Sequence, residues 1–250
     1  MTRKYGWKPQ LPDHRDRIYK AEVDVAVLPS AASVKGGCPP IKDQGDLGAC
    51  TAHGLTSCLE FLELKDGHPY VPLSRLFLYY NERALEGTIG SDSGANIRDG
   101  IKALNKLGCC PEIEWQYKPK SFAERPRPKC YSDAVVHDLL TYAAIQTAQD
   151  MKASLAAGFP FVLGFSVYDS FESDQVAQTG IVPMPGPDES CLGGHCVYCC
   201  GYDDASAMFT CANSWGVSWG QQGFFQMPYA YLTNPNLASD FWALRKTRSE

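Results

Sequence analysis

Cys50 is the residue of this chain whose position most directly suggests chemistry. It ends the turn-rich run DQGDLGAC, and TAHGLTSCLEFLELK, which follows directly, has the composition of a helix. The positive end of a helix dipole favours a thiolate over a thiol. The pKa of Cys50 should therefore lie well below the value of about 8.5 for a free cysteine. Alternatively, Cys50 is a small buried side chain, because free cysteine is among the most buried residue types.

Three further residues could complete a site around this thiol. A nucleophilic cysteine needs a base, and the base needs a third group that fixes its tautomer and orientation. His195, preceded by two glycines in GGHCVYCCGYDD, and Asn213, in CANSWGVSWGQQGFF, could fill these roles. The amide of Gln44 and the backbone N–H of Cys50 lie on one turn and could both donate to an oxyanion. The four residues predict acyl transfer, provided that folding brings them together.

His53 is a second candidate for the base, because on a helix it would share a face with Cys50. The positive end of the helix dipole disfavours an imidazolium there, whereas the mechanism needs one beside the thiolate. A base on the same helix would also leave no cleft for a substrate. We therefore expect His195 to be the base.

The three stretches resemble the motifs of the papain-like cysteine peptidases, which read Gln-Gly-x-Cys-Gly-Ser-Cys-Trp, Gly-Gly-His-Ala and Asn-Ser-Trp-Gly-x-x-Trp-Gly. Four more stretches, PLSRLFLYYNERALEG, DSGANIRDGIKAL, GYDD and MPYAYL, are similar to the microbial branch of that family. In that branch Leu-Gly-Ser-Cys-Thr-Ala commonly surrounds the nucleophile. The resemblance extends from about residue 5 to residue 242, in the family's order of motifs.

The resemblance implies an α+β fold with a helical left half, an antiparallel β-barrel right half and a substrate cleft between them. Cys50 would lie on the left wall, with His195 and Asn213 on the right. Trp215 would shield the bond between the histidine and the asparagine from water.

The resemblance also implies three substrate-binding positions, Gly94, Trp215 and Cys196. Gly94, in SDSGAN, is similar to the glycine whose backbone pairs with an extended peptide, a form of strand addition. Cys196 replaces the alanine that usually follows the histidine, on the wall of the pocket for the second substrate residue.

The chain departs from the family's pattern near the nucleophile. Leu47 replaces a cysteine that forms a disulfide in secreted relatives, so one covalent link is missing. Thr51 replaces the tryptophan that usually follows the nucleophile. No helical inhibitory pro-domain of the usual kind is found, and residues 1–37 are too short for one.

The order of elements agrees with two halves. Helix-like periodicity dominates first, and β-branched and aromatic runs bounded by Gly and Pro dominate later. Helices are predicted at about 50–65, 73–87, 95–108 and 150–158, with a Pro-rich connector at 117–130 and strands in FPFVLGFSVY, GGHCVYCCGYDD, MFTCANSW and GFFQMP. The predicted organisation is an extended arm over 1–37 and a peptidase domain over 38–250, with a mainly helical half (38–125) and a mainly β half (126–250).

The arm is rich in proline and carries Tyr5 and Trp7. An extended Pro-rich segment loses little entropy on docking. The arm could therefore occlude the cleft or brace the β half.

The eleven cysteines allow two other interpretations. Cys196 and Cys199 have a spacing found in zinc sites, but in a strand they would point to opposite faces, and a second ligand pair is missing. We therefore expect no metal and no cofactor. A disulfide could link Cys130 to Cys109 or Cys110 across the connector in an oxidising compartment, and the pairing cannot be read from sequence.

Composition excludes other classes of function. The net charge of −5 and the pI near 5.6 argue against nucleic acid as a partner. No run of eighteen uncharged apolar residues is present, which argues against a membrane span. The start of the chain does not resemble a signal peptide, which favours a cytoplasmic location, although the cysteine content pulls the other way.

We therefore expect a monomeric hydrolase, a thiol protease that cleaves a peptide or protein through an acyl-thioester on Cys50. Two alternatives remain open. One is a catalytically silent relative that only binds peptides, and the other is an acyltransferase that uses the same thiol.

Overall fold

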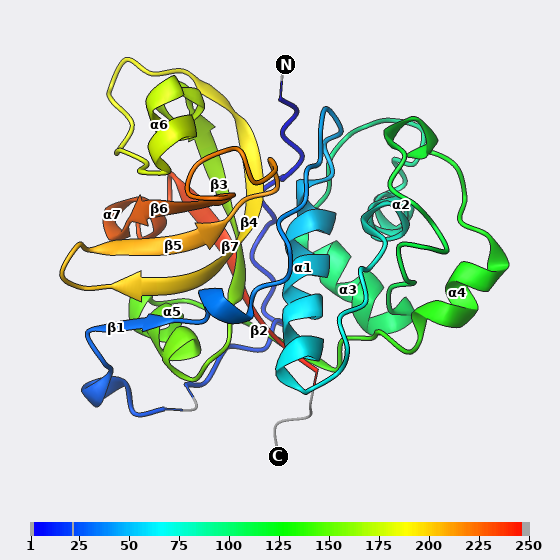
Figure 1. Ribbon diagram of the computed structural model, residues 1–250, viewed down its shortest axis with the longest axis horizontal. Coiled ribbons are helices and arrows are strands. Elements are labelled where there is room, and N and C mark those ends of the chain that lie inside the picture. Colours follow the sequence, from blue (N-terminus) through cyan, green and yellow to red (C-terminus); the bar gives the residue numbers. More distant parts are fainter. Residues whose placement is uncertain (1–2, 22, 247–250) are drawn as a thin grey trace.

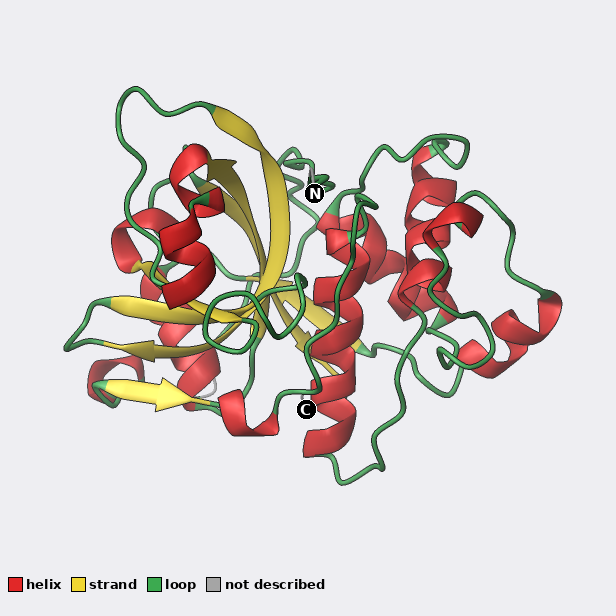
Figure 2. Ribbon diagram, turned by 45° about the horizontal axis from the view of Figure 1, so that its top comes forward, coloured by secondary structure: helices red, strands yellow, loops and turns green. Residues whose placement is uncertain are grey.

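The computed structural model describes residues 3–21 and 23–246. Residues 1–2 and 22 of the predicted arm lie outside the described residues. The predicted α+β architecture is present, with most helices on one side and a sheet on the other (Figure 1). Figure 2 shows the same two halves, with α1 at their junction.

The helices are α1 (Cys50–Lys65), α2 (Arg75–Glu86), α3 (Ile97–Leu107), α4 (Pro128–Ala134), α5 (Ala148–Ala156), α6 (Asp174–Thr179) and α7 (Tyr229–Leu232). The strands are β1 (Ala31–Ser33), β2 (Thr141–Ala144), β3 (Phe161–Tyr168), β4 (Cys191–Asp203), β5 (Met208–Ala212), β6 (Phe224–Pro228) and β7 (Ala238–Arg245). Short 3-10 turns are η1 (Val25–Val27), η2 (Lys35–Gly37), η3 (Pro119–Ser121) and η4 (Asp169–Glu172).

Helix α1 is the central helix, and it has the predicted span. Every residue from Cys50 to Glu63 is buried, because the helix packs against α2 and α3 on one side and against β4 on the other. A helix that is buried all round needs no polar face. This packing fixes the position of its first residue, Cys50, between the halves.

Helix α2 ends where its capping residues predict. Ser74 Oγ accepts the Phe77 N–H at 3.1 Å, and Gly87 adopts a left-handed conformation with φ 70°. These are the usual N-cap and C-cap arrangements. No helix in the described part of the chain is long and apolar enough to cross a membrane.

The sheet is antiparallel, with strand order β2-β7-β3-β4-β5-β6, and β1 pairs with β4. It is not a closed barrel, so this part of the prediction is corrected: β2 and β6 remain edge strands. Other segments cover these edges. Tyr19 N–H donates to Ala144 O of β2 at 2.8 Å, and Val182 N–H donates to Gln226 O of β6 at 2.9 Å. An edge that is already paired has no need of closure.

Strand β4 separates two hydrophobic cores. Cys196 and Cys200 pack in the core shared with α1, whereas Cys199 packs in the core on the other face. The prediction that Cys196 and Cys199 point to opposite faces is confirmed. No group of three or more His, Cys, Asp or Glu residues suited to a metal ion is found within the described ranges.

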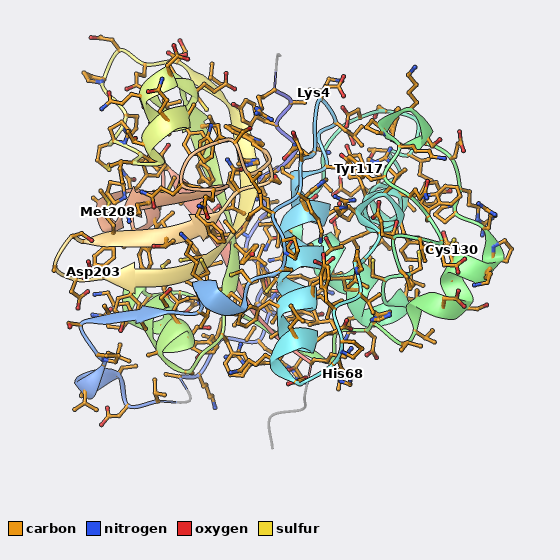
Figure 3. The ribbon with its side chains drawn as sticks, viewed as in Figure 1. Lys4, His68, Tyr117, Cys130, Asp203 and Met208 are labelled. Atoms are coloured by element: carbon orange, nitrogen blue, oxygen red, sulfur yellow. The ribbon has the colours of Figure 1, made fainter. Side chains whose placement is uncertain are left out.

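The connector packs on the helical half. Cys130 lies on α4 (Figure 3), in the core shared with α1. Its thiol is a hydrogen-bonding neighbour of the Cys110 thiol, while Cys109 Sγ donates to Ser74 O at 3.3 Å. Cys110 is therefore the residue that proximity favours for a bridge to Cys130.

The arm runs between the halves and then along the β half (Figure 1). Trp7 forms a parallel bridge with Ala95, and Ile18 forms one with Ala144 on the edge of β2. Strand β1 then pairs with β4. The arm thus contacts both the cleft region and the sheet.

Candidate active site

The turn before Cys50 is held by Asp92. Gly48 N–H donates to its carboxylate at 3.0 Å, and Tyr79 Oη donates to it at 2.6 Å. Lys4 of the arm forms an ion pair with the same carboxylate at 3.0 Å (Figure 3). Hydrogen bonds next to Leu47 therefore anchor the turn where secreted relatives have a disulfide.

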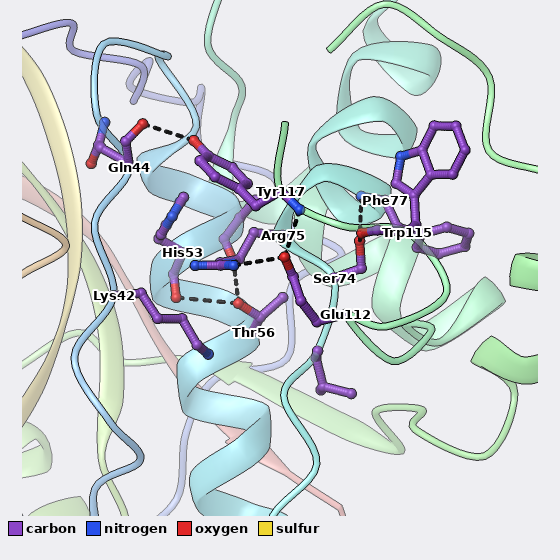
Figure 4. A network of polar contacts seen from close by, with 12 residues as sticks. Lys42, Gln44, His53, Thr56, Ser74, Arg75, Phe77, Glu112, Trp115 and Tyr117 are labelled. Carbon is purple, nitrogen blue, oxygen red and sulfur yellow. Dashed lines mark hydrogen bonds and ion pairs between the residues drawn. The ribbon is translucent and has the colours of Figure 1, made fainter. Parts of the chain in front are cut away.

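Gln44 is fully buried, and both its side-chain amide and its backbone carbonyl are hydrogen-bonded. Its Nε2 donates to Leu47 O at 3.0 Å and to Lys4 O of the arm at 3.3 Å. Its Oε1 accepts from Ser214 Oγ at 2.6 Å, and its carbonyl accepts from Tyr117 Oη at 2.9 Å (Figure 4). These contacts fix the amide with its N–H groups toward the segment that lies in front of Cys50.

His195 and Asn213 are brought together on the β half. His195 Nε2 lies 2.8 Å from Asn213 Oδ1, which also accepts the Ser214 N–H at 2.8 Å. Because an amide oxygen only accepts, the imidazole carries its proton on Nε2 when it is neutral. Nδ1 of His195 is then the acceptor that could take a proton from a thiol.

Trp215 lies beside this pair. Its ring centroid is 5.2 Å from that of His195, and its side chain is buried. An indole in this position keeps water away from the bond between His195 and Asn213.

The sulfur atom of Cys50 lies beside the β half. Backbone N–H groups of Cys196, Gly6 and Thr51 are directed at it. Cys196 follows His195 on β4, so the Cys50 sulfur lies against the strand that carries the predicted base. Three consecutive arm residues contact the predicted site: Lys4 O accepts from Gln44, the Tyr5 ring contacts His195, and the Gly6 N–H is directed at the Cys50 sulfur.

The thiol and the imidazole are both neutral in this form. Burial raises the pKa of Cys50 to about 11, and it lowers the pKa of His195 to about 4. The expectation of a depressed Cys50 pKa is therefore wrong for the form in which the arm is docked. Exclusion of water from the thiolate outweighs the helix dipole and the neighbouring N–H donors.

The arm adds a strand between the halves in front of Cys50. Gly6 O accepts the Ala95 N–H at 2.7 Å, and Lys8 N–H donates to Ala95 O at 3.2 Å. On the other side, Trp7 N–H donates to Gly194 O at 2.9 Å. Gly94 is the neighbour of the pairing residue, and its own N–H donates to Tyr79 Oη at 3.1 Å.

Side chains of the arm fill the space beside the catalytic pair. The Tyr5 ring stands edge-on to the His195 ring at 6.1 Å, and its hydroxyl donates to Glu172. Arg3 stacks over the Trp215 ring at 4.5 Å. The imidazole is therefore covered by the arm.

The Trp7 side chain is buried in the core shared with α1 and reaches Asp240. Its indole N–H donates to the Asp240 carboxylate at 2.9 Å. A Cβ at Gly164 would lie 2.0 Å from the indole, so glycine is required for this close approach. Asp240 has φ 58°, an uncommon conformation for a residue other than glycine, and burial raises its pKa to about 6.

Gly6 is required at the narrowest point of the arm. A Cβ there would lie 1.7 Å from Gly48 O, on the turn before the nucleophile.

Cys196 is 1% exposed, and its Sγ faces Gly54 of α1. The thiol of Cys196 thus packs between α1 and β4.

Three residues of the site were not predicted from the sequence: Asp92, Ser214 and Asp240. Ser214 could have been found, because it follows Asn213 within the recognised motif. Asp92 and Asp240 carry no local signal, since their partners are distant in the sequence.

Comparisons with known proteins agree with this geometry. Residues 29–241 match the model of the papain family of cysteine proteases. The solved structure of xylellain, a cysteine protease from Xylella fastidiosa, is 40% identical, covers 99% of each chain and superposes with a TM-score of 0.91. Procathepsin L 3 of Tenebrio molitor, at 19% identity and a TM-score of 0.71, shares the fold.

Two curated relatives extend the likeness. An uncharacterized peptidase C1-like protein of Acanthamoeba polyphaga mimivirus is 44% identical over 215 residues, which are 82% of this chain and 69% of the relative. A gut-specific cysteine proteinase of Caenorhabditis elegans is 32% identical over 206 residues, and the match spans 77% of this chain and 54% of that relative. On the matched motifs, the fold and these relatives, the chain belongs to the papain family of cysteine proteases.

Proposed function

We propose that the chain is a cysteine peptidase that cleaves peptide bonds through an acyl-thioester on Cys50, and that its arm holds it latent. The observation that supports this most is the arm itself. An extended peptide lies between Ala95 and Gly194, bonded to both through its backbone, with the Gly6 N–H directed at the Cys50 sulfur. The cleft therefore has the form of a peptide-binding groove that leads past a thiol.

The reaction begins when the arm leaves the cleft. His195 Nδ1 takes the proton of Cys50, and the thiolate attacks the scissile carbonyl carbon. The negative charge moves to the carbonyl oxygen, which accepts from the Gln44 amide and the Cys50 N–H. In the docked form Lys4 O occupies the Gln44 donor, so the arm blocks this step as well.

The imidazolium then gives its proton to the nitrogen of the leaving amine as the C–N bond breaks. Water, deprotonated by His195, attacks the thioester carbon and releases the acid and the thiol. Asn213 keeps the Nε2 proton of His195 in place, which leaves Nδ1 free for every transfer.

Latency follows from the burial of the catalytic pair. With the pKa of Cys50 at about 11 and that of His195 at about 4, the uncharged forms dominate at neutral pH. Departure of the arm returns water to the site, and the thiolate and the imidazolium then stabilise each other.

A peptide-library cleavage assay tests this function, with Cys50→Ala as the control. We expect cleavage by Gly6→Ala, whose added Cβ cannot fit against Gly48 O so that the arm must leave the cleft, and none when this variant also carries Cys50→Ala. Uncleaved peptides that still bind would identify a silent peptide-binding relative. Products conjugated to an added amine, in place of free acids, would identify an acyltransferase.

A further inference from the structure

A small cavity lies behind the catalytic pair, between α1 and the end of β5. Its volume is about 10 Å³, and its lining includes His53, Ser57, Asn213 and Ser214. A space of this size holds at most one water molecule.

Three buried polar atoms belong to side chains that line this cavity: the Tyr198 hydroxyl, which has the Cys38 thiol as a neighbour, His53 Nε2 and Asn213 Nδ2. Neither His53 Nε2 nor Asn213 Nδ2 has a hydrogen-bond partner among the described residues. Both side chains are buried, with 1% and 4% exposed. Buried polar atoms nearly always have a partner, and one water molecule in this cavity would supply a partner to both His53 Nε2 and Asn213 Nδ2.

The hydrogen-bonding roles of the two atoms are complementary. His53 Nδ1 lies 2.8 Å from Ala49 O, and a carbonyl only accepts, so Nδ1 carries the proton. Nε2 of the neutral ring is then an acceptor. Asn213 Oδ1 already accepts from His195 and Ser214, so its Nδ2 remains as a donor.

His53 remains neutral in this environment. Burial is the largest cause that lowers its pKa well below the usual value, and the nearby cations Arg75 and Lys42 act in the same direction. His53 and Tyr117 contact each other edge-on at 5.0 Å, near these cations (Figure 4). The His53 ring on the wall of this cavity is therefore neutral at neutral pH, and its Nε2 is an acceptor.

We propose that His53 is a positioning residue that acts on Asn213 through one water molecule in this cavity. The water donates to His53 Nε2 and accepts from Asn213 Nδ2. This holds the amide with its oxygen toward His195, since the flipped amide would set N–H against N–H. The inference concerns the site of the proposed peptidase and so rests on that function, but its structural part does not depend on turnover.

The structural test is a high-resolution crystal structure of the full chain and of His53→Phe. The native chain should show one water within about 2.7–3.2 Å of His53 Nε2 and Asn213 Nδ2. The water should be lost in His53→Phe, whose ring preserves the edge-on contact with Tyr117. An empty cavity, or a direct contact between the two side chains, would overturn the proposal.

The kinetic test is a double-mutant cycle with Asn213→Ala. His53→Phe should lower kcat about two- to tenfold with little change in KM, the effect expected for loss of one neutral hydrogen bond. In the Asn213→Ala background the same change should have no further effect, because the residue acts through that amide. His53→Gln, which returns a polar atom near Nε2, should restore part of the rate.

Thr56→Val is the matched control on α1. Thr56 Oγ1 donates to Ala52 O at 2.7 Å, and its side chain does not line the cavity. This variant should lower the melting temperature and leave kcat unchanged. Equal losses of kcat for His53→Phe with and without Asn213 would contradict the positioning role. If the native structure holds the water but the arm-released Gly6→Ala variant cleaves no peptide, the peptidase function alone would be contradicted.

Discussion

At the scale of single residues, the site is defined by two opposing influences on Cys50. The helix N-terminus and three backbone N–H groups favour the thiolate, whereas complete burial favours the thiol. Burial dominates while the arm is docked. The reactivity of this thiol should therefore report the position of the arm.

A thiol-labelling experiment tests this balance. With limiting iodoacetamide near pH 6, the native chain should be modified first at Cys191, whose side chain is exposed. Gly6→Ala should instead be modified first at Cys50, because the added Cβ cannot fit against Gly48 O and the arm must leave. Mapping the adducts by mass spectrometry gives the order. First modification of Cys50 in both proteins would show that the docked arm does not protect it.

The chemistry-bearing residues could be predicted because residue type and order are visible in a sequence. Cys50, His195, Asn213 and Gln44 were identified in this way. In the structure His195 is bonded to Asn213, and residues 4–6 of the arm contact Gln44, His195 and Cys50, whereas the catalytic roles of the four stay predictions. The charge state of the pair could not be predicted, since it depends on burial by a distant segment. Asp240 could not be predicted for a similar reason: its role depends on contact with Trp7, 233 positions away.

At the scale of elements, α1 and the arm together determine the geometry around Cys50. Helix α1 fixes Cys50, and the arm pairs with Ala95 and Gly194 on the two walls. The same arm bridges the edge of β2 at Ile18 and adds β1 to β4. Both predicted roles of the arm, occlusion and bracing, therefore have contacts that support them, and these contacts lie in separate stretches.

Two glycines of the arm allow occlusion to be tested by itself. Gly6→Ala should raise peptidase activity by more than about tenfold, because it disrupts several backbone hydrogen bonds that are each worth about 1 kcal/mol. Gly36→Ala is the matched control, since a Cβ there has no neighbour within 4 Å. Initial rates on one fluorogenic peptide, with the protein concentration fixed, provide the measurement. Equal rates for the two variants would mean that the docked arm does not limit turnover.

The longer helices were predicted, whereas the short helices α4, α6 and α7 and the strand β1 were not. Periodicity and capping residues predicted the full span of α1. They predicted α2 at 73–87, and the helix runs from Arg75 to Glu86. Strands β2 and β7 were not predicted, because β2 has only four residues and β7 includes Ser239 and Asp240 among its apolar residues. Closure of the sheet was expected from the resemblance, but segments outside the strands cover its edges.

At the scale of the whole molecule, Asp240 connects the arm to the junction of the halves. Its carboxylate accepts from the Trp7 indole and from the Gln10 N–H, yet burial raises its pKa from 3.8 to about 6. A carboxyl group with a raised folded pKa stabilises the folded state fully below the unfolded pKa. This contribution is lost as pH rises through the folded pKa.

The melting temperature should therefore depend on Asp240 between about pH 4 and pH 6. Asp240→Asn keeps an acceptor and tolerates the left-handed backbone, but it cannot ionise. The melting temperature of this variant relative to the native chain should rise as pH increases through this window. Asp188→Asn, on an exposed loop, serves as the control and should show no such trend. Parallel pH profiles for Asp240→Asn and the native chain would contradict the linkage.

The central claim is that Cys50 attacks a peptide carbonyl once the arm leaves the cleft. Intact-mass spectrometry of acid-quenched Gly6→Ala during turnover of a peptide ester tests it most directly. The account predicts a transient mass increase equal to the acyl group, located on Cys50 by fragmentation, which decays as the free acid forms. Turnover without any adduct on Cys50, or continued turnover by Gly6→Ala that also carries Cys50→Ala, would contradict it.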